Sequence, residues 1–101
     1  MYIWLPVDKE DAKYAKITSQ VEVLKWALVD FDAGEVKSVR FYENRNDFGE
    51  EWVDFVILKN KYETYIDFMN EGMMCLCVRE EETIEDIMTA FKFKELDEMG
   101  L

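Results

Sequence analysis

The chain has 101 residues, of which half are apolar and 15% aromatic, so we expect one packed α/β domain over residues 1–101 and exclude a disordered chain. Acidic residues number 23 against 12 basic ones, which gives a formal charge of −11. A field of that sign repels phosphate backbones and anionic lipid, so the charge argues against nucleic-acid and membrane-surface partners.

Targeting and catalytic signals are absent from the sequence. No apolar run has membrane-spanning length, and the opening stretch 1–7 carries no basic region or small-residue cleavage site, so we expect a cytoplasmic protein. The chain has no His, which removes the usual general base near neutral pH and the commonest zinc ligand. This absence excludes Ser-His-Asp and Cys-His catalysis within this chain alone.

The first half of the chain is typical of strands. Residues 1–7 predict a strand that ends around Pro6, because proline cannot donate to a strand ladder. Residues 8–20 are polar and predict a loop. Residues 24–31 and 36–42 are rich in β-forming residues and flank the turn 32–35, which contains Gly34, so they predict a hairpin.

The middle of the chain predicts a short helical turn within 43–51 and then a strand over 52–58, buried on both faces. Asn60 followed by Glu63 is typical of a capped helix start. The apolar residues after it recur at helical spacing, and Gly72 marks the helix end. This apolar face comprises Tyr62, Tyr65, Ile66 and Met69.

The last third predicts a strand over 73–78 and a helix that opens at Thr83, with Asp86 completing a capping pattern. This helix carries an apolar stripe and is expected to fray near Met99 and Gly100. The order is β-β-β-(short α)-β-α-β-α. It predicts a mixed five-stranded sheet in which strands 1–3 are antiparallel and the last two are parallel, joined by a right-handed crossover. The stripe comprises Ile84, Ile87, Met88 and Phe91.

Four stretches, in order, resemble the dinitrogenase iron–molybdenum cofactor biosynthesis family, which includes NifX, NafY and the C-terminal domain of NifB. They are the first strand Met1–Asp8, the hairpin Trp26–Val36, the strand Val53–Ile57 and the helix opening Thr83–Phe91. The resemblance implies a ribonuclease-H-like α/β fold without ribonuclease activity. It also implies a non-enzymatic protein that binds or carries a metal–sulfur cofactor of the iron–sulfur or iron–molybdenum type.

Three departures from the family pattern indicate a degenerate ligand motif. The family's His-Phe-Gly stretch falls near Ser19 and Gln20, where no residue matches. The loop after the fourth strand, which usually contains Gly, has Asn60 at its centre instead. The helix between strands three and four is cut to a stump around 46–51, so we expect one thinly covered sheet face, available to a homodimer or another protein partner.

Sulfur side chains are the candidate metal ligands. Cys75 and Cys77 alternate along one strand, so both thiols and Met73 are expected on one face, and soft sulfur suits copper, zinc or an iron–sulfur species. The alternative is that they pack as small apolar groups, since two thiols without His make half of a closed zinc site.

Two other functions stay open. A regulatory or protein–protein interaction module that has lost its cofactor would explain the shortened middle segment and the aromatic strands. A carboxylate-metal hydrolase would use Asp8 and Asp30, and it requires these carboxylates to lie within about 4–6 Å of each other. The remaining acidic clusters have no ordered ligand spacing and are expected to form solvated surface.

Overall fold

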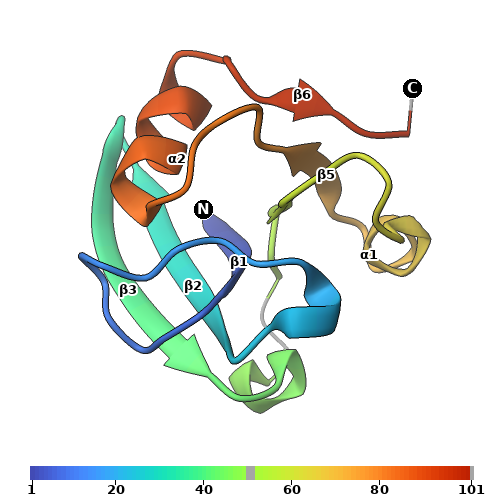
Figure 1. Cartoon of the computed structure of the whole chain (residues 1–101), viewed down its shortest axis with the longest axis horizontal. Coiled ribbons are helices and arrows are strands. Elements are labelled where there is room, and N and C mark those ends of the chain that lie inside the picture. Colours follow the sequence, from blue (N-terminus) through green and yellow to red (C-terminus); the bar gives the residue numbers. More distant parts are fainter. Residues whose placement is uncertain (50–51, 101) are drawn as a thin grey trace.

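A computed structural model describes residues 1–49 and 52–100, and its centre is a six-stranded mixed sheet in the order β3-β2-β1-β4-β5-β6 (Figure 1). Strands β1, β2 and β3 pair antiparallel, whereas β1, β4 and β5 run parallel. The mixed sheet and its strand directions are confirmed. The strands are β1 (Tyr2–Val7), β2 (Lys25–Asp32), β3 (Glu35–Tyr42), β4 (Phe55–Leu58), β5 (Met74–Cys77) and β6 (Asp97–Glu98).

The helical elements are short. The α-helices are α1 (Ile66–Asn70) and α2 (Ile84–Lys92), and the 3-10 turns are η1 (Gln20–Glu22) and η2 (Arg45–Phe48). Among residues 1–49 and 52–100, no helix has the length and apolar character needed to cross a bilayer.

The hairpin and the last helix form as the sequence predicts. Ala33 and Gly34 have φ of 51° and 78°, which is the backbone twist of the two-residue turns that suit hairpins. At the start of α2, the Thr83 hydroxyl accepts a hydrogen bond from the Asp86 amide, 3.2 Å apart. The predicted stripe of α2 faces the sheet, since Ile84, Ile87 and Met88 are buried.

Each sheet face has its own apolar layer because successive residues of β1 point to opposite faces. Ile3, Leu5 and Val7 pack with the buried side of α2. Trp4 lies in the other layer, with Trp26 and with Phe68 from α1. The central strand is therefore buried on both sides, which fixes its register against β2 and β4.

The sheet face expected to be thinly covered is filled instead. Phe48 of η2 packs edge-on against Tyr2, Trp4 and Tyr42, with ring centroids 5.1–5.9 Å apart. Trp4 and Trp26 beneath are 2% and 8% exposed. One turn of 3-10 helix suffices because large aromatic rings cover the area that a longer helix would cover. Glu50 and Glu51 of the expected stump lie outside the described residues.

Two expectations about the chain's helices are wrong. Residues 60–65 form a turn, not the start of a helix, and Tyr62, Ile66 and Met69 of the expected buried face are 86%, 53% and 43% exposed. The side that packs is the one carrying Phe68. After Lys92 the chain does not fray toward Gly100 but turns back, and β6 pairs antiparallel with β5, giving six strands instead of five.

Gly72 ends α1 as predicted. Its φ is 93°, its amide donates to the carbonyl of Met69, and the Met73 amide donates to that of Phe68, which is the two-bond pattern of a Schellman end. A Cβ atom at this position would lie 2.3 Å from the Trp52 ring.

Replacing Gly72 by Ala should therefore cost more stability than replacing Gly49 by Ala. Gly49 has a similar φ of 91°, with ψ of −145°, but no atom of the described residues lies within 4 Å of its added Cβ. The positive φ costs alanine about 1–3 kcal/mol at each position, and the clash adds about 1 kcal/mol or more at Gly72. Urea unfolding measures both. Equal losses would show that Trp52 does not lie over α1 in solution.

Candidate functional site

The loops that follow the three parallel strands meet at one end of the sheet. They are residues 8–24 after β1, 59–65 after β4 and 78–83 after β5. Open α/β sheets bind ligands in the crevice beyond the carboxyl ends of their parallel strands. We therefore built the candidate site from these loops.

The carboxylate of Glu63 joins two of these loops. Its Oε1 accepts a hydrogen bond from the backbone amide of Gln20, 2.8 Å away. Its Oε2 accepts from the amides of Lys59 and Asn60, each 3.0 Å away. One side chain thus satisfies three backbone donors from segments about 40 residues apart in the sequence, two of them consecutive amides that converge on one oxygen.

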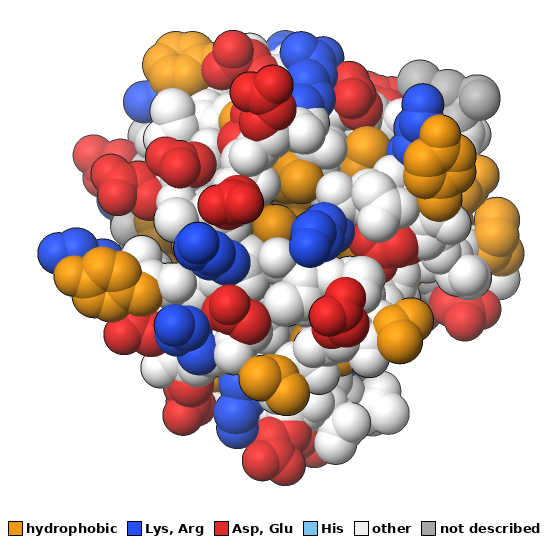
Figure 2. All heavy atoms as spheres, in the orientation of Figure 1, with side chains coloured by type: hydrophobic (Ala, Val, Ile, Leu, Met, Phe, Trp, Pro, Cys, Tyr) orange, Lys and Arg blue, Asp and Glu red, His pale blue; other side chains and the backbone are white. Residues whose placement is uncertain are grey.

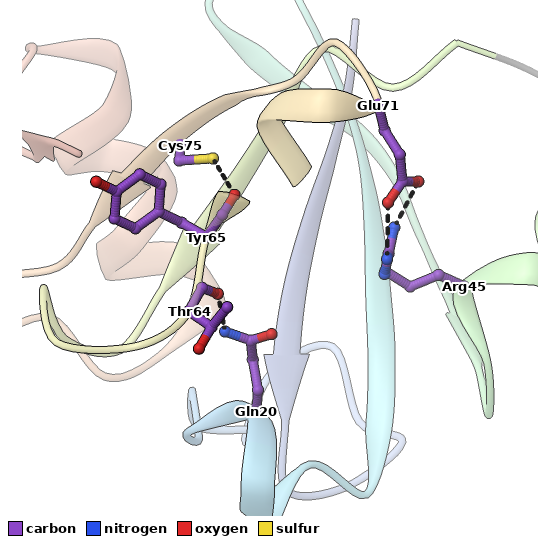
Figure 3. A network of polar contacts seen from close by, with 6 residues as sticks. All are labelled: Gln20, Arg45, Thr64, Tyr65, Glu71 and Cys75. Carbon is purple, nitrogen blue, oxygen red and sulfur yellow. Dashed lines mark hydrogen bonds and ion pairs between the residues drawn. The ribbon is translucent and has the colours of Figure 1, made fainter. Parts of the chain in front are cut away.

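Further hydrogen bonds hold the same loops without using that carboxylate. The side-chain amide of Gln20 donates to the carbonyl of Thr64 over 2.8 Å (Figure 3). The Asn60 side chain accepts from the Tyr62 amide over 3.0 Å, forming an Asx turn. Ser19 is directed elsewhere, because its hydroxyl donates to Glu22, 3.3 Å away.

The structure therefore brings together two of the three ligand-loop positions expected from the resemblance, Gln20 and Asn60. Between them opens a cavity of about 480 Å³. Its rim carries two strongly exposed apolar side chains, Val21 at 96% and Tyr62 at 86%. The cavity is lined by Gln20, Val21, Asn60, Tyr62, Glu63 and Thr64.

A second cavity, of about 370 Å³, lies at the same end of the sheet and includes Lys59 in its wall. The hydroxyl oxygen of Thr18 is buried there and has no hydrogen-bond partner among the described residues. Lys16 is paired across the same cavity with Glu82 at 3.7 Å. Positively and negatively charged side chains therefore line this cavity together, so it favours neither an anionic nor a cationic ligand.

Glu63 makes contacts that its position in the sequence does not predict. Its position three residues after Asn60 is the signal of a helix cap, and the bond from the Asn60 amide to Glu63 does form. The bonds from Gln20 and Lys59 lie outside that pattern. Gln20 belongs to a loop 43 residues earlier, so local spacing alone does not reveal the contact.

The three candidate sulfur ligands lie together on one face, as predicted. Met73, Cys75 and Cys77 all belong to the apolar layer that contains Trp4 and Phe68, and the two cysteines are 4% and 3% exposed. The Cys75 thiol donates to the carbonyl of Tyr65, with 3.7 Å between sulfur and oxygen (Figure 3).

Burial raises the pKa of both thiols, and for Cys77 the negative charge of Asp97 raises it further. Metal ligation requires thiolate, and desolvation opposes its formation. No group of three or more Cys, His, Asp or Glu side chains within the described part of the chain is arranged to hold a metal ion. The residues present therefore do not fit a resident metal–sulfur cluster.

The carboxylate pair required by the hydrolase hypothesis is not formed. Asp30 pairs with Tyr2 at the start of β1, whereas Asp8 follows the end of that strand. Six residues of extended chain separate the two positions by about 20 Å. Asp30 lies 3.7 Å from the N-terminal ammonium group, and Asp8 accepts from the amide of Lys16. The expectation that these carboxylates lie within coupling distance is wrong.

One further polar group was not anticipated from the sequence. The Arg45 guanidinium donates two hydrogen bonds of 3.1 Å to the carboxylate of Glu71 (Figure 3). Its carbon lies 4.5 Å from the Phe68 ring centroid and 5.6 Å from that of Trp26. This arrangement fastens η2 to α1 over the aromatic layer, which is a structural role.

The surface in Figure 2 carries acidic and basic side chains interspersed, with the acidic ones more numerous. Charges of both signs therefore cover this face of the molecule.

Solved structures with this fold include a crystal structure of a candidate dinitrogenase from Methanocaldococcus jannaschii. It is 20% identical, the TM-score is 0.77, and the match covers 99% of this chain and 95% of that one. An NMR structure of the same protein, there named as from Methanococcus jannaschii, is 19% identical to this chain, with a TM-score of 0.77 and coverage of 100% and 94%. An NMR structure of a candidate NifB protein from Thermotoga is 15% identical, with a TM-score of 0.74 and coverage of 96% and 91%.

At these identities the likeness establishes the fold. The resemblance drawn from the sequence is confirmed at that level, because these neighbours carry dinitrogenase and NifB names. No family model and no curated protein matches the chain.

The raised thiol pKa values predict how stability depends on pH. The unfolded thiols titrate at a lower pKa than the folded ones, so the free energy of unfolding should fall as pH rises above about 8.5. Each thiol contributes up to about 1.4 kcal/mol per pH unit. Denaturant unfolding of the wild type and of a Cys75→Ala, Cys77→Ala variant isolates this contribution from that of tyrosine and lysine. Parallel curves would show that the thiols are not buried.

Proposed function

We propose that this protein is a non-enzymatic binding module, related to the iron–molybdenum cofactor biosynthesis proteins, whose loops at the carboxyl ends of the parallel strands bind a ligand without holding a resident metal cluster. The observation that carries the proposal is the network around Glu63. At the expected ligand loop it presents backbone amides, an internal carboxylate and an open cavity, with no metal-ligating imidazole or thiol in the cavity wall.

The relation to cofactor proteins is supported by the fold and by the names of its structural neighbours. The proposal includes a ribonuclease-H-like fold. It is supported by the sheet, in which β1 joins the antiparallel hairpin β2–β3 to the parallel strands β4 and β5. The degenerate ligand motif is supported by Gln20 and Asn60. Both are neutral amides, and both use their side chains to hold the loops.

A cluster carrier that uses Cys75, Cys77 and Met73 is the alternative. It has the right atoms on one face, but it requires β5 and α1 to separate before a cluster can reach them, because all three side chains are less than a tenth exposed. Such a separation would expose Phe68 and Trp26 as well, and burying side chains of this size is worth several kcal/mol.

Anaerobic reconstitution with iron and sulfide separates the two functions. We expect the wild-type protein and a Cys75→Ala, Cys77→Ala variant to retain the same substoichiometric amount of iron after desalting, with no cluster absorption in the visible spectrum. The alanine variant is the matched control, because alanine keeps the layer apolar while removing both sulfur ligands.

Stoichiometric iron and a visible chromophore in the wild type, lost in the double variant, would contradict the proposal and establish the carrier.

A further inference from the structure

We propose that the three amides holding Glu63 form a binding site for a small oxyanion, such as a carboxylate or a tetrahedral oxyanion, and that the Glu63 side chain is an internal occupant that an external anion replaces. This inference deepens the proposed function, on whose loop cavity it rests, by naming the class of ligand and the device that controls access to it.

The donor geometry is that of an anion site. Lys59 and Asn60 present consecutive amides to one carboxylate oxygen, and Gln20 presents its amide to the other. Consecutive amides that converge on one point form a concave nest with a positive partial charge. A carboxylate of another molecule has the same two acceptor atoms at the same spacing as Glu63 and would satisfy the same donors.

Two basic side chains lie beside the nest, within a chain whose net charge is −11. Lys59 and Lys61 flank the nest, and neither forms a salt bridge within residues 1–49 and 52–100. Two ammonium groups on one short loop raise the local concentration of small anions. Lys59 also lines the second cavity, whose wall carries Asp8, Glu80, Glu81 and Glu82, so the two lysines act only on the groups next to the nest.

An incoming anion also has a route to the nest. Glu63 is only partly buried and forms part of the wall of the 480 Å³ cavity, so its carboxylate can leave toward that opening. The exposed Val21 and Tyr62 at the rim offer apolar contact to the body of a ligand whose charged end enters the nest.

The nest does not depend on Glu63 for its shape. Gln20 remains fastened to Thr64 through its side-chain amide, and Asn60 remains fixed by its Asx turn. These bonds keep the two loops together when the carboxylate departs. Removal of the Glu63 side chain should therefore leave three converging amides open to solvent, where an external anion can take the place of the carboxylate.

The test is an amide chemical-shift titration of the full chain with sodium acetate and, separately, sodium sulfate, at constant ionic strength maintained with sodium chloride. In Glu63→Ala we expect saturable shifts of the Gln20, Lys59 and Asn60 amides with at least one of the two anions. We expect affinity at least tenfold higher than in the wild type, where the tethered carboxylate competes at high effective concentration.

Glu22→Ala is the matched control. Glu22 lies on the same loop as Gln20 and is exposed, and its replacement removes the same charge. Among the described residues, its carboxylate accepts a hydrogen bond from the Ser19 hydroxyl and from no backbone amide. This variant should bind no more tightly than the wild type. Equal gains in Glu22→Ala and Glu63→Ala would show a bulk charge effect and overturn the proposal.

Glu63→Gln keeps the proposal testable if the alanine variant fails to fold. Glutamine retains one acceptor oxygen without the charge, so it should compete less well than Glu63, and its anion affinity should be several-fold above that of the wild type. Absence of saturable shifts at the three amides in a folded variant would overturn the oxyanion site. A failed anion titration would not change the iron reconstitution result, which tests the proposed function separately. Conversely, a cluster bound to the thiols would overturn the proposed function without changing the result of the anion titration.

Discussion

Backbone amides at the open end of a parallel sheet need acceptors, and in this protein one carboxylate supplies them. Glu63 accepts from Gln20 in the loop after β1 and from Lys59 and Asn60 in the loop after β4. The Gln20 bond is partly buried and the Lys59 and Asn60 bonds are exposed, so this carboxylate adds to the Gln20–Thr64 hydrogen bond in holding the two loops together.

The features that could be predicted from the sequence are those set by local pattern. The hairpin follows from two β-rich runs around Ala33 and Gly34, and the start of α2 follows from Thr83 and Asp86. The features that could not be predicted depend on contacts between distant segments. Strand β6 consists of two acidic residues with no strand pattern, and it forms because their backbone pairs with Leu76 and Cys77. Arg79 reinforces this pairing, with its guanidinium 2.9 Å from Asp97.

The candidate site divides in the same way. The spacing of Cys75 and Cys77 correctly predicts that both side chains lie on one face of the sheet. It does not predict how deeply these side chains are buried. The depth comes from Phe68 and Trp26, which lie earlier in the chain and pack against each other in the same apolar layer as the cysteines. Likewise, Asn60 and Glu63 do form the capping bond that their spacing indicates, yet no helix begins there, and the carboxylate also accepts from the Gln20 and Lys59 amides.

The fold of this chain and the chemistry of its ligand loops therefore have to be considered separately. The fold is shared with proteins carrying dinitrogenase and NifB names, at 15–20% identity. The sulfur atoms belong to the apolar layer, and the ligand loops hold one another. A ligand that binds here meets backbone amides, two lysines and an apolar rim, which suits an anion with an apolar body better than a bare metal ion.

The central claim is that Glu63 occupies the amide nest in the free protein, and hydrogen exchange of three backbone amides tests it most directly. In the wild type, the amides of Gln20, Lys59 and Asn60 should exchange far more slowly than that of Val21, which lies on the same loop with an exposed side chain and has no hydrogen bond to Glu63. Glu63→Ala should abolish the protection of all three together. Fast exchange of these amides in the wild type, or protection unchanged in the variant, would contradict the account.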